Sequence, residues 1–219
     1  MAITINGSAN TIAGLAVGGL PDGTVDADTL ASSSVTDAKI TAVSSSKLSG
    51  ALPAISGAAL TGVGISDIDV WRLTAGNTGD QTPISSNWAR NNEAGTSLLG
   101  SGMTESSGVF TFPSTGHWLI QFNHAFGVSG NERYANSDIQ ITTDNGSNWD
   151  EVSRQGGSIT QVDGSTTIGS AQPTVIFDVT STTTHKVRFC AAFSNNSCTS
   201  NGATDISQTT ALFIRLGDT

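Results

Sequence analysis

Hydrophobic and polar positions alternate most clearly between residues 107 and 128. Two runs rich in aromatic and branched side chains, 109–112 and 117–126, flank the turn-forming residues 113–116. This pattern predicts a strand, a turn and a second strand. One face of the second run would carry the bulky side chains Trp118, Ile120, Phe122 and His124. The opposite face would be mixed, with Leu119, Gln121, Asn123 and Ala125. Such two-faced strands are typical of antiparallel sandwiches, so we expect the core here.

Short runs of the same kind recur to the C-terminus at the spacing of a β-sandwich. The candidate strands cover residues 68–73, 84–90, 109–112, 117–126, 137–143, 149–154, 158–162, 173–179, 185–193 and 209–216. No segment has a convincing helical period, so we predict an all-β, antiparallel sandwich of about 8–10 strands. We expect the last run in the middle of its sheet, because an exposed edge of this composition would promote aggregation.

Aromatic residues divide the chain into two parts. All four Trp, the single Tyr and all eight Phe lie after residue 70. Because large aromatic side chains dominate core burial, we predict an extended, low-complexity arm over residues 1–66 and a folded head over residues 67–219. The arm has the Gly and Ser of a flexible linker. It also has regularly spaced Leu, Ile and Val, which identical chains running side by side would bury. We favour an extended arm that orders by assembly or by docking on a larger partner.

Charge and hydropathy restrict the partners. The 219 residues include 18 acidic and nine basic ones, giving a formal charge of −9, and the basic residues do not cluster. Nucleic acid and anionic membrane surfaces are therefore not expected partners. No run reaches the roughly 18–20 apolar residues of a membrane span, so membrane insertion is not expected either. The N-terminus lacks the basic residue that precedes the apolar run of a secretion signal, which favours synthesis in a cytoplasm.

The first strand pair resembles that of a known fold family. Residues 108–122, GVFTFPSTGHWLIQF, are similar to the G-x-F-x-x-P-x-x-G-x-Y-x-F pattern of complement-type and tumour-necrosis-factor-like trimeric jelly rolls, with Trp118 in place of the usual Tyr. The resemblance extends over residues 68–219 and implies a jelly-roll head that forms a homotrimer. The predicted trimer core consists of Trp118, Ile120, Phe122, Leu212 and Ile214.

The arm carries a second resemblance. Its runs 23–30 (GTVDADTL), 35–40 (VTDAKI) and 47–62 (KLSGALPAISGAALTG) resemble the repetitive N-terminal parts of structural proteins of tailed bacteriophages, especially marine and cyanobacterial ones. This implies a protein located in the virion, with the arm bound to other tail or capsid proteins. A trimeric tail fibre whose head binds a host surface glycan or protein is the first hypothesis. A capsid decoration protein that stabilises the shell is the second, and a glycan-degrading enzyme is the third.

Residues 142–149 match the Asp box, [ST]-x-D-x-G-x-x-W, familiar from sialidase propellers. In those enzymes the box lies away from the catalytic centre. We predict a structural turn in which Asp144 accepts backbone N–H groups, Gly146 takes a positive φ and Trp149 packs over the turn.

Recognition residues are expected in two polar loops, 127–135 and 194–204. Tyr and Arg make good contacts on such loops, and Asn suits hydrogen bonding to sugars. The candidate receptor contacts are Arg133, Tyr134, Asn195 and Asn196.

Catalytic and metal-binding patterns are absent from the sequence. Carboxylates are scattered, and no spacing selects the facing pair that a glycosidase needs. The three histidines form no zinc motif, and no nucleophile motif or phosphate loop occurs. We therefore predict a non-enzymatic protein with no catalytic residue, metal or cofactor. Cys190 and Cys198 fit either a disulfide across a hairpin or two free thiols.

Overall fold

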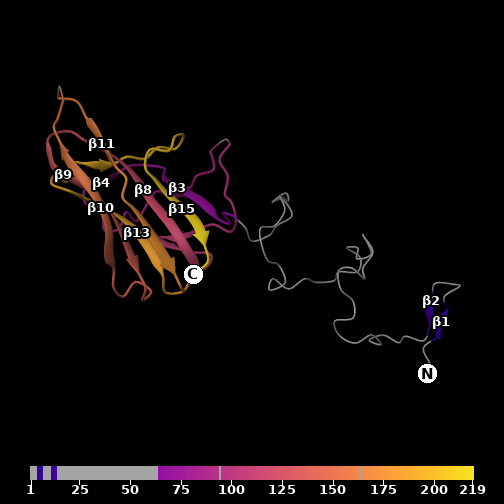
Figure 1. Cartoon of the computed structure of the whole chain (residues 1–219). Helices are drawn as coiled ribbons and strands as arrows, with labels where there is room; N and C mark the ends of the chain where they lie inside the picture. Colours follow the sequence, from indigo (N-terminus) through magenta and orange to yellow (C-terminus); the bar gives the residue numbers. More distant parts are fainter. Residues whose placement is uncertain (1–3, 7–10, 14–63, 94, 163) are drawn as a thin grey trace. The chain divides into compact units, whose positions relative to one another are not determined.

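The computed structural model describes residues 4–6, 11–13, 64–93, 95–162 and 164–219 (Figure 1). Contacts between Cα atoms divide the chain into two units, Met1–Gly57 and Ala58–Thr219. In the first unit, β1 (Thr4–Asn6) and β2 (Thr11–Ala13) pair antiparallel. Residues 64–66 of the predicted arm are described with the second unit, and its remaining residues, which carry most of its Leu, Ile and Val, lie outside the described residues.

The second unit, the head, is an antiparallel sandwich of two sheets (Figure 1). The five-stranded sheet has the order β10-β9-β13-β7-β6. Its strands are β6 (Thr104–Ser106), β7 (Val109–Thr111), β9 (Glu132–Thr142), β10 (Asp150–Ile159) and β13 (Lys186–Phe193). The described residues of the head contain no helix, which confirms the predicted all-β class.

The eight-stranded sheet has the order β4-β14-β8-β15-β3-β5, with β11 and β12 also paired to β8. Its strands are β3 (Ile68–Leu73), β4 (Asn77–Thr78), β5 (Trp88–Arg90), β8 (Gly116–Val128), β11 (Thr167–Ala171), β12 (Thr174–Val179), β14 (Thr199–Ser200) and β15 (Thr210–Gly217). As expected, the last strand, β15, is central, because it pairs with β8 on one side and β3 on the other.

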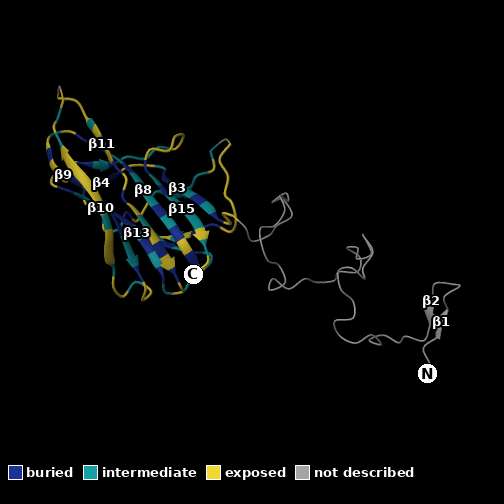
Figure 2. Ribbon diagram, viewed as in Figure 1, coloured by how far each residue is buried: buried dark blue, intermediate teal, exposed yellow. Residues whose placement is uncertain are grey.

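The core lies between the sheets, and its buried side chains are mostly aromatic and aliphatic. Figure 2 shows the buried positions of the strands in dark blue. Phe110 of β7 is fully buried at its centre. Its ring centroid lies 5.3–5.4 Å from those of Trp71, Trp88, Phe189 and Phe213, which come from four other strands. Edge-to-face and tilted contacts at this separation add to the gain from burial, so Phe110 joins the two sheets.

His124 is a polar member of this core. It is 1% exposed, and its ring stacks on Phe122 with centroids 4.9 Å apart. Its Nδ1 lies 2.6 Å from the Ser137 hydroxyl and its Nε2 lies 2.8 Å from the Ser200 hydroxyl. Burial lowers the pKa of His124 from 6.5 to about 3, because desolvation penalises the imidazolium. The side chain is therefore a neutral, doubly hydrogen-bonded core residue.

Candidate interaction surfaces

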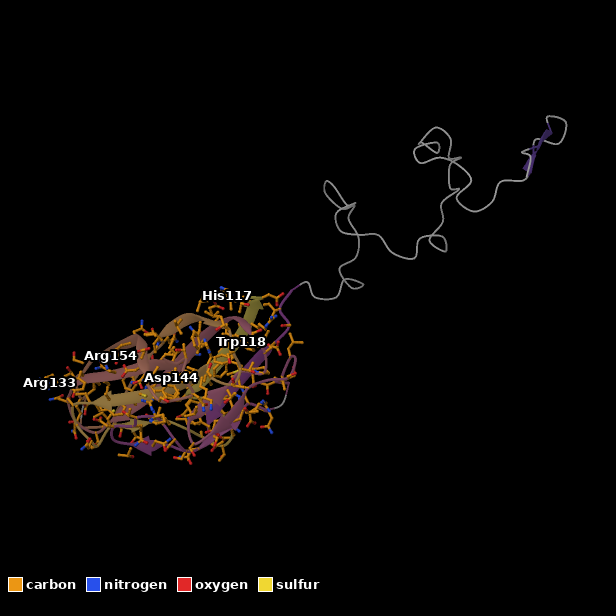
Figure 3. The ribbon with its side chains drawn as sticks, turned by 90° about the horizontal axis from the view of Figure 1, so that it is seen from below. His117, Trp118, Arg133, Asp144 and Arg154 are labelled. Atoms are coloured by element: carbon orange, nitrogen blue, oxygen red, sulfur yellow. The ribbon has the colours of Figure 1, made fainter. Side chains whose placement is uncertain are left out.

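The structure corrects the predicted trimer core on β8. Trp118, Ile120 and Phe122 are fully buried within one chain, as part of the core between the two sheets. Figure 3 labels Trp118 in the head. These three side chains have no surface left to offer to a second chain. The reason is that the alternation shows which side chains share a face but does not show what covers that face. Leu212 and Ile214 of β15 lie on the opposite, outer face and are only partly buried.

The outer face of the eight-stranded sheet carries a row of aliphatic side chains, which we call the apolar row. Strand register aligns Ile176 of β12 with Leu119 of β8, Leu119 with Ile214 of β15, and Ile214 with Ile68 of β3. Leu99 extends the row, since its backbone exchanges two hydrogen bonds with Ile68, at 3.1 and 3.0 Å. Ile176 is 59% exposed and Leu99 is 46% exposed, so the row opens onto solvent in the single chain.

Flanking rows make this face apolar in the middle and polar at its rim. Leu212 pairs with Val70 and with Gln121, one step along the strands from the apolar row. Beyond it, Thr210 pairs with Asn123, whose side-chain amide donates to the threonine hydroxyl at 3.2 Å. An exposed apolar patch with a polar rim is the usual signature of a protein–protein contact.

The predicted receptor residues lie together at one end of the head, but two of them are not in a loop. β9 begins at Glu132, so Arg133 and Tyr134 lie on a strand, because the connection from β8 of one sheet to β9 of the other covers only residues 129–131. Arg133 is exposed at the edge of the head (Figure 3), with its guanidinium 5.3 Å from the Tyr134 ring centroid.

The second receptor segment is fixed to the first by a buried carboxylate. Glu132 is 2% exposed, and its Oε2 accepts the Ser194 backbone N–H at 2.9 Å, the Ser194 hydroxyl at 2.7 Å and the Asn195 N–H at 3.1 Å. Asn195 and Asn196 follow in an exposed turn. Hydrogen bonds to a charged group are stronger than neutral ones, so the four candidate residues form one ordered polar surface.

The head has two distinct ends. Arg215 near the C-terminus donates its backbone N–H to the Asp67 carbonyl at 3.0 Å, so the two ends of the head's chain lie together. β8 runs from this end, starting at Gly116, to the far end at Val128, next to the start of β9 and the candidate receptor residues. Asp67, which follows the predicted arm in sequence, therefore lies near one end of the thirteen-residue strand β8, and the receptor surface lies near the other end.

The Asp-box residues form a closed turn between β9 and β10. Asp144 Oδ1 accepts the Asn148 backbone N–H at 2.9 Å and the Thr142 hydroxyl at 2.7 Å, and its Oδ2 accepts the Asn148 amide at 2.6 Å. These bonds lower the pKa of Asp144 from 3.8 to about 2, led by the Asn148 backbone N–H. Gly146 has φ +90°, and a Cβ there would lie 3.7 Å from the Trp149 ring, so the turn packs against the indole.

Neither cysteine forms a disulfide in the structure. Cys190 and Cys198 are both buried free thiols. Burial raises the pKa of each to about 12, which keeps them protonated near neutral pH. The described part of the chain brings together no group of three or more His, Cys, Asp or Glu side chains that could hold a metal ion. It also contains no helix long and apolar enough to cross a membrane.

Solved structures with a similar fold were found by comparison. Eiger TNF from S. frugiperda is similar, with a TM-score of 0.52 and 10% identity over 69% of this chain and 93% of that chain. The head is a tumour-necrosis-factor-like jelly roll. Murine APRIL at pH 5.0 matches with a TM-score of 0.48 and 10% identity over 68% of this chain and 98% of that chain. At this identity the likeness concerns the fold of the jelly roll. No protein-family model and no curated protein matches the chain.

The apolar row was missed at the sequence level, although a signal for it exists. Leu119 alternates with the aromatic residues of β8 and was assigned to the mixed face. In the same way, Ile176 alternates with the inward Phe177, and Ile68 and Val70 alternate with Asp69. Each strand contributes only one or two aliphatic residues, so the row can be recognised only when the strand register is known.

Proposed function

We propose that this protein is a homotrimeric structural protein of a tailed-bacteriophage virion, in which the N-terminal arm attaches to other virion proteins and the jelly-roll head binds the host surface. The apolar row carries the trimer part of this proposal. The resemblance of residues 23–62 to phage structural proteins supports the virion part. The separation of the two ends of the head supports a fibre that presents its receptor surface outward.

Two copies of the same chain are the occupants we assign to the apolar row. The row crosses β12, β8, β15 and β3, so all its members except Leu99 come from paired strands of the sheet. Burying exposed aliphatic surface contributes roughly 25 cal/mol per Å², so association would stabilise both the contact and the fold. Arms of three chains that start from one trimer would also lie close enough to bury their Leu, Ile and Val.

The mass of the full-length protein in solution tests the assembly. We expect three times the chain mass of 22.3 kDa. Leu119→Asp places a charge in the middle of the apolar row and should reduce the mass to that of one chain, because an unpaired buried charge is costly. Val152→Asp is the matched control, since Val152 is 38% exposed on β10 of the other sheet. A wild-type monomer, or equal masses for the two variants, would overturn the assignment.

A cryo-EM map of the virion tests the biological setting. Density for the head at the tip of a tail-attached fibre is the expected result. Density spread over the capsid surface would instead identify a decoration protein, and virions lacking this protein would then adsorb normally but lose shell stability. Absence of the protein from purified virions would refute both assignments.

Competition for adsorption tests the host-binding role separately. Excess purified full-length protein should block adsorption of the phage to host cells, because the head would occupy the receptor. Arg133→Glu should weaken this block, whereas Val152→Asp, which lies away from the receptor surface, should not. Full adsorption in the presence of saturating wild-type protein would refute host binding by the head.

A further inference from the structure

The outer face of the five-stranded sheet contains a hollow of about 360 Å³, which we call the Trp149 hollow. Three parts of the chain that are distant in sequence line this hollow, because strand pairing brings them together. Ser106 and Thr111 come from β6 and β7, Asn145 and Trp149 from the Asp-box turn, and Lys186 and Arg188 from β13. It faces away from the apolar row and is built by a single chain.

Hydrogen-bond donors in the hollow lack acceptors within the protein. Trp71, Trp88 and Trp118 each donate their indole N–H to a protein oxygen. Over the described residues, Trp149 is the one Trp whose indole N–H has no such partner, and its side chain is partly exposed. In the same described residues, the side chains of Lys186 and Asn145 also donate to no protein atom. The hollow therefore offers several unpaired donors at one place.

Arg188 is held in position by an aromatic ring and one hydrogen bond. Its guanidinium lies 4.2 Å from the Trp149 ring centroid, and its Nε donates to Gln140 Oε1 at 2.8 Å. Among the described residues, its terminal nitrogens donate to no carboxylate or carbonyl oxygen. A guanidinium whose plane is fixed by an aromatic ring and one hydrogen bond is already oriented for a carboxylate ligand.

The positive charge of the hollow is unusual in this acidic protein. The described basic residues are Arg72, Arg90, Arg133, Arg154, Lys186, Arg188 and Arg215. Four of the seven lie within 4.0 Å of a carboxylate oxygen, whereas Arg133, Lys186 and Arg188 do not. Two of those three charges therefore lie side by side on one strand and line the same hollow.

Nearby carboxylates are already engaged by other groups. Asp144 is bonded to Thr142 and Asn148 within the turn. Glu105 accepts the Gly108 backbone N–H at 2.6 Å, and Glu151, two strands across the sheet from Arg188, pairs with Arg154. No salt bridge among the described residues therefore pairs Lys186 or Arg188 with a carboxylate.

We propose that the Trp149 hollow binds a saccharide that carries a carboxylate, with Arg188 and Lys186 on the carboxylate. The indole N–H of Trp149, the amide of Asn145 and the hydroxyls of Ser106 and Thr111 then bond the sugar hydroxyls. The volume lies at the small end of the roughly 300–1,000 Å³ of ligand pockets, which suits one or two sugar rings. The inference rests on the proposed function only for its biological setting, because the hollow forms within one chain.

An NMR titration of the full-length protein with glucuronate, at fixed ionic strength, tests this site. Glucose has the same ring without the carboxylate and should bind at least about ten-fold more weakly, because a charge-assisted hydrogen bond is lost. Lys186→Gln and Arg188→Gln should each weaken glucuronate binding by a similar factor. Trp149→Phe keeps a ring under Arg188 but removes the N–H, and should weaken it less.

Arg133→Gln is the matched control, because it removes one unpaired positive charge at the other end of the head. Equal loss of binding in Arg133→Gln and Lys186→Gln would overturn the site and reduce the effect to net charge. Inorganic phosphate or sulfate binding as tightly as glucuronate would overturn the saccharide assignment. A monomeric protein that still binds glucuronate would refute the trimer and support the hollow, so the two proposals fail separately.

Discussion

The two outer faces of the sandwich differ in chemistry, although both cover the same aromatic core. The eight-stranded sheet turns aliphatic side chains outward along the apolar row, with Ile176 at 59% exposure. The five-stranded sheet turns charged and hydroxyl side chains outward. There Arg154 donates two hydrogen bonds to the largely buried carboxylate of Asp138, at 2.7 and 3.1 Å, and Arg188 and Lys186 line the Trp149 hollow.

This difference shows that the outward positions of the strands can vary in composition more freely than the inward positions. The inward positions must fill the space between the sheets, so both sheets carry large apolar residues there. The outward positions have no such requirement, and their composition reflects what each face meets. An apolar face suits a permanent partner of the same composition, whereas a polar face with unpaired donors suits a soluble ligand.

Removal of the aromatic centre should destabilise the head, and with it both faces. This is the largest loss of unfolding free energy that we expect. Phe110→Ala deletes the ring that contacts four aromatic side chains from both sheets, which should cost about 3–5 kcal/mol of unfolding free energy. Urea unfolding at fixed protein concentration measures this loss. Ile168→Ala, at a position 71% exposed, should change the free energy by less than about 0.5 kcal/mol. Similar losses for the two variants would contradict the assigned centre.

Acid should lower the folding stability of the whole head, and therefore affect both faces, through His124. The pKa of His124 is lowered to about 3 in the folded head, whereas in the unfolded chain it returns to 6.5. The unfolded state therefore binds more protons below pH 6.5, so stability is complete above that pH and falls as the pH decreases. At pH 5 the loss should be about 2 kcal/mol relative to pH 8.

Unfolding free energies measured between pH 5 and 8 check the His124 prediction. His124→Gln keeps a hydrogen-bonding side chain near Ser137 and Ser200 but cannot titrate, so its stability should depend less on pH in this range. The carboxylate of Asp144, with a pKa of about 2, does not titrate there and so does not interfere. An equal pH dependence in the variant and the wild type would show that another group is responsible.

Local signals made part of this fold predictable. The β9–β10 turn is closed by bonds among residues 142–149, so its motif contains nearly all the information it needs. The two strands around the turn at 113–116, β7 and β8, were likewise predicted, because the alternation is strong on both sides, although they lie in different sheets. β8 carries Trp118, Ile120, Phe122 and His124 on one face, as the period of two requires.

Long-range register made the rest unpredictable. The inward face of β8 was assigned to a contact between chains, although the five-stranded sheet of the same chain covers it. The Trp149 hollow joins Ser106, Trp149 and Arg188, which are more than 35 residues apart in sequence. Arg133 was assigned to a loop because Gly127 and Gly130 suggested an early end to the strand, whereas the connection between β8 and β9 covers only residues 129–131.

The Asp-box turn offers a way to alter one face and leave the other unchanged. Asp144→Ala removes the acceptor of the Asn148 N–H and of the Thr142 hydroxyl, so the turn that holds Trp149 beside Arg188 should loosen. Glucuronate binding should weaken by a few-fold, because the donors remain but are less well oriented. The mass in solution should stay that of the wild type, since the apolar row lies on the other sheet. Asp150→Ala, which removes an exposed carboxylate next to the turn, is the control and should leave both measurements unchanged. A change in mass for Asp144→Ala would show that the two faces are coupled through the core rather than independent.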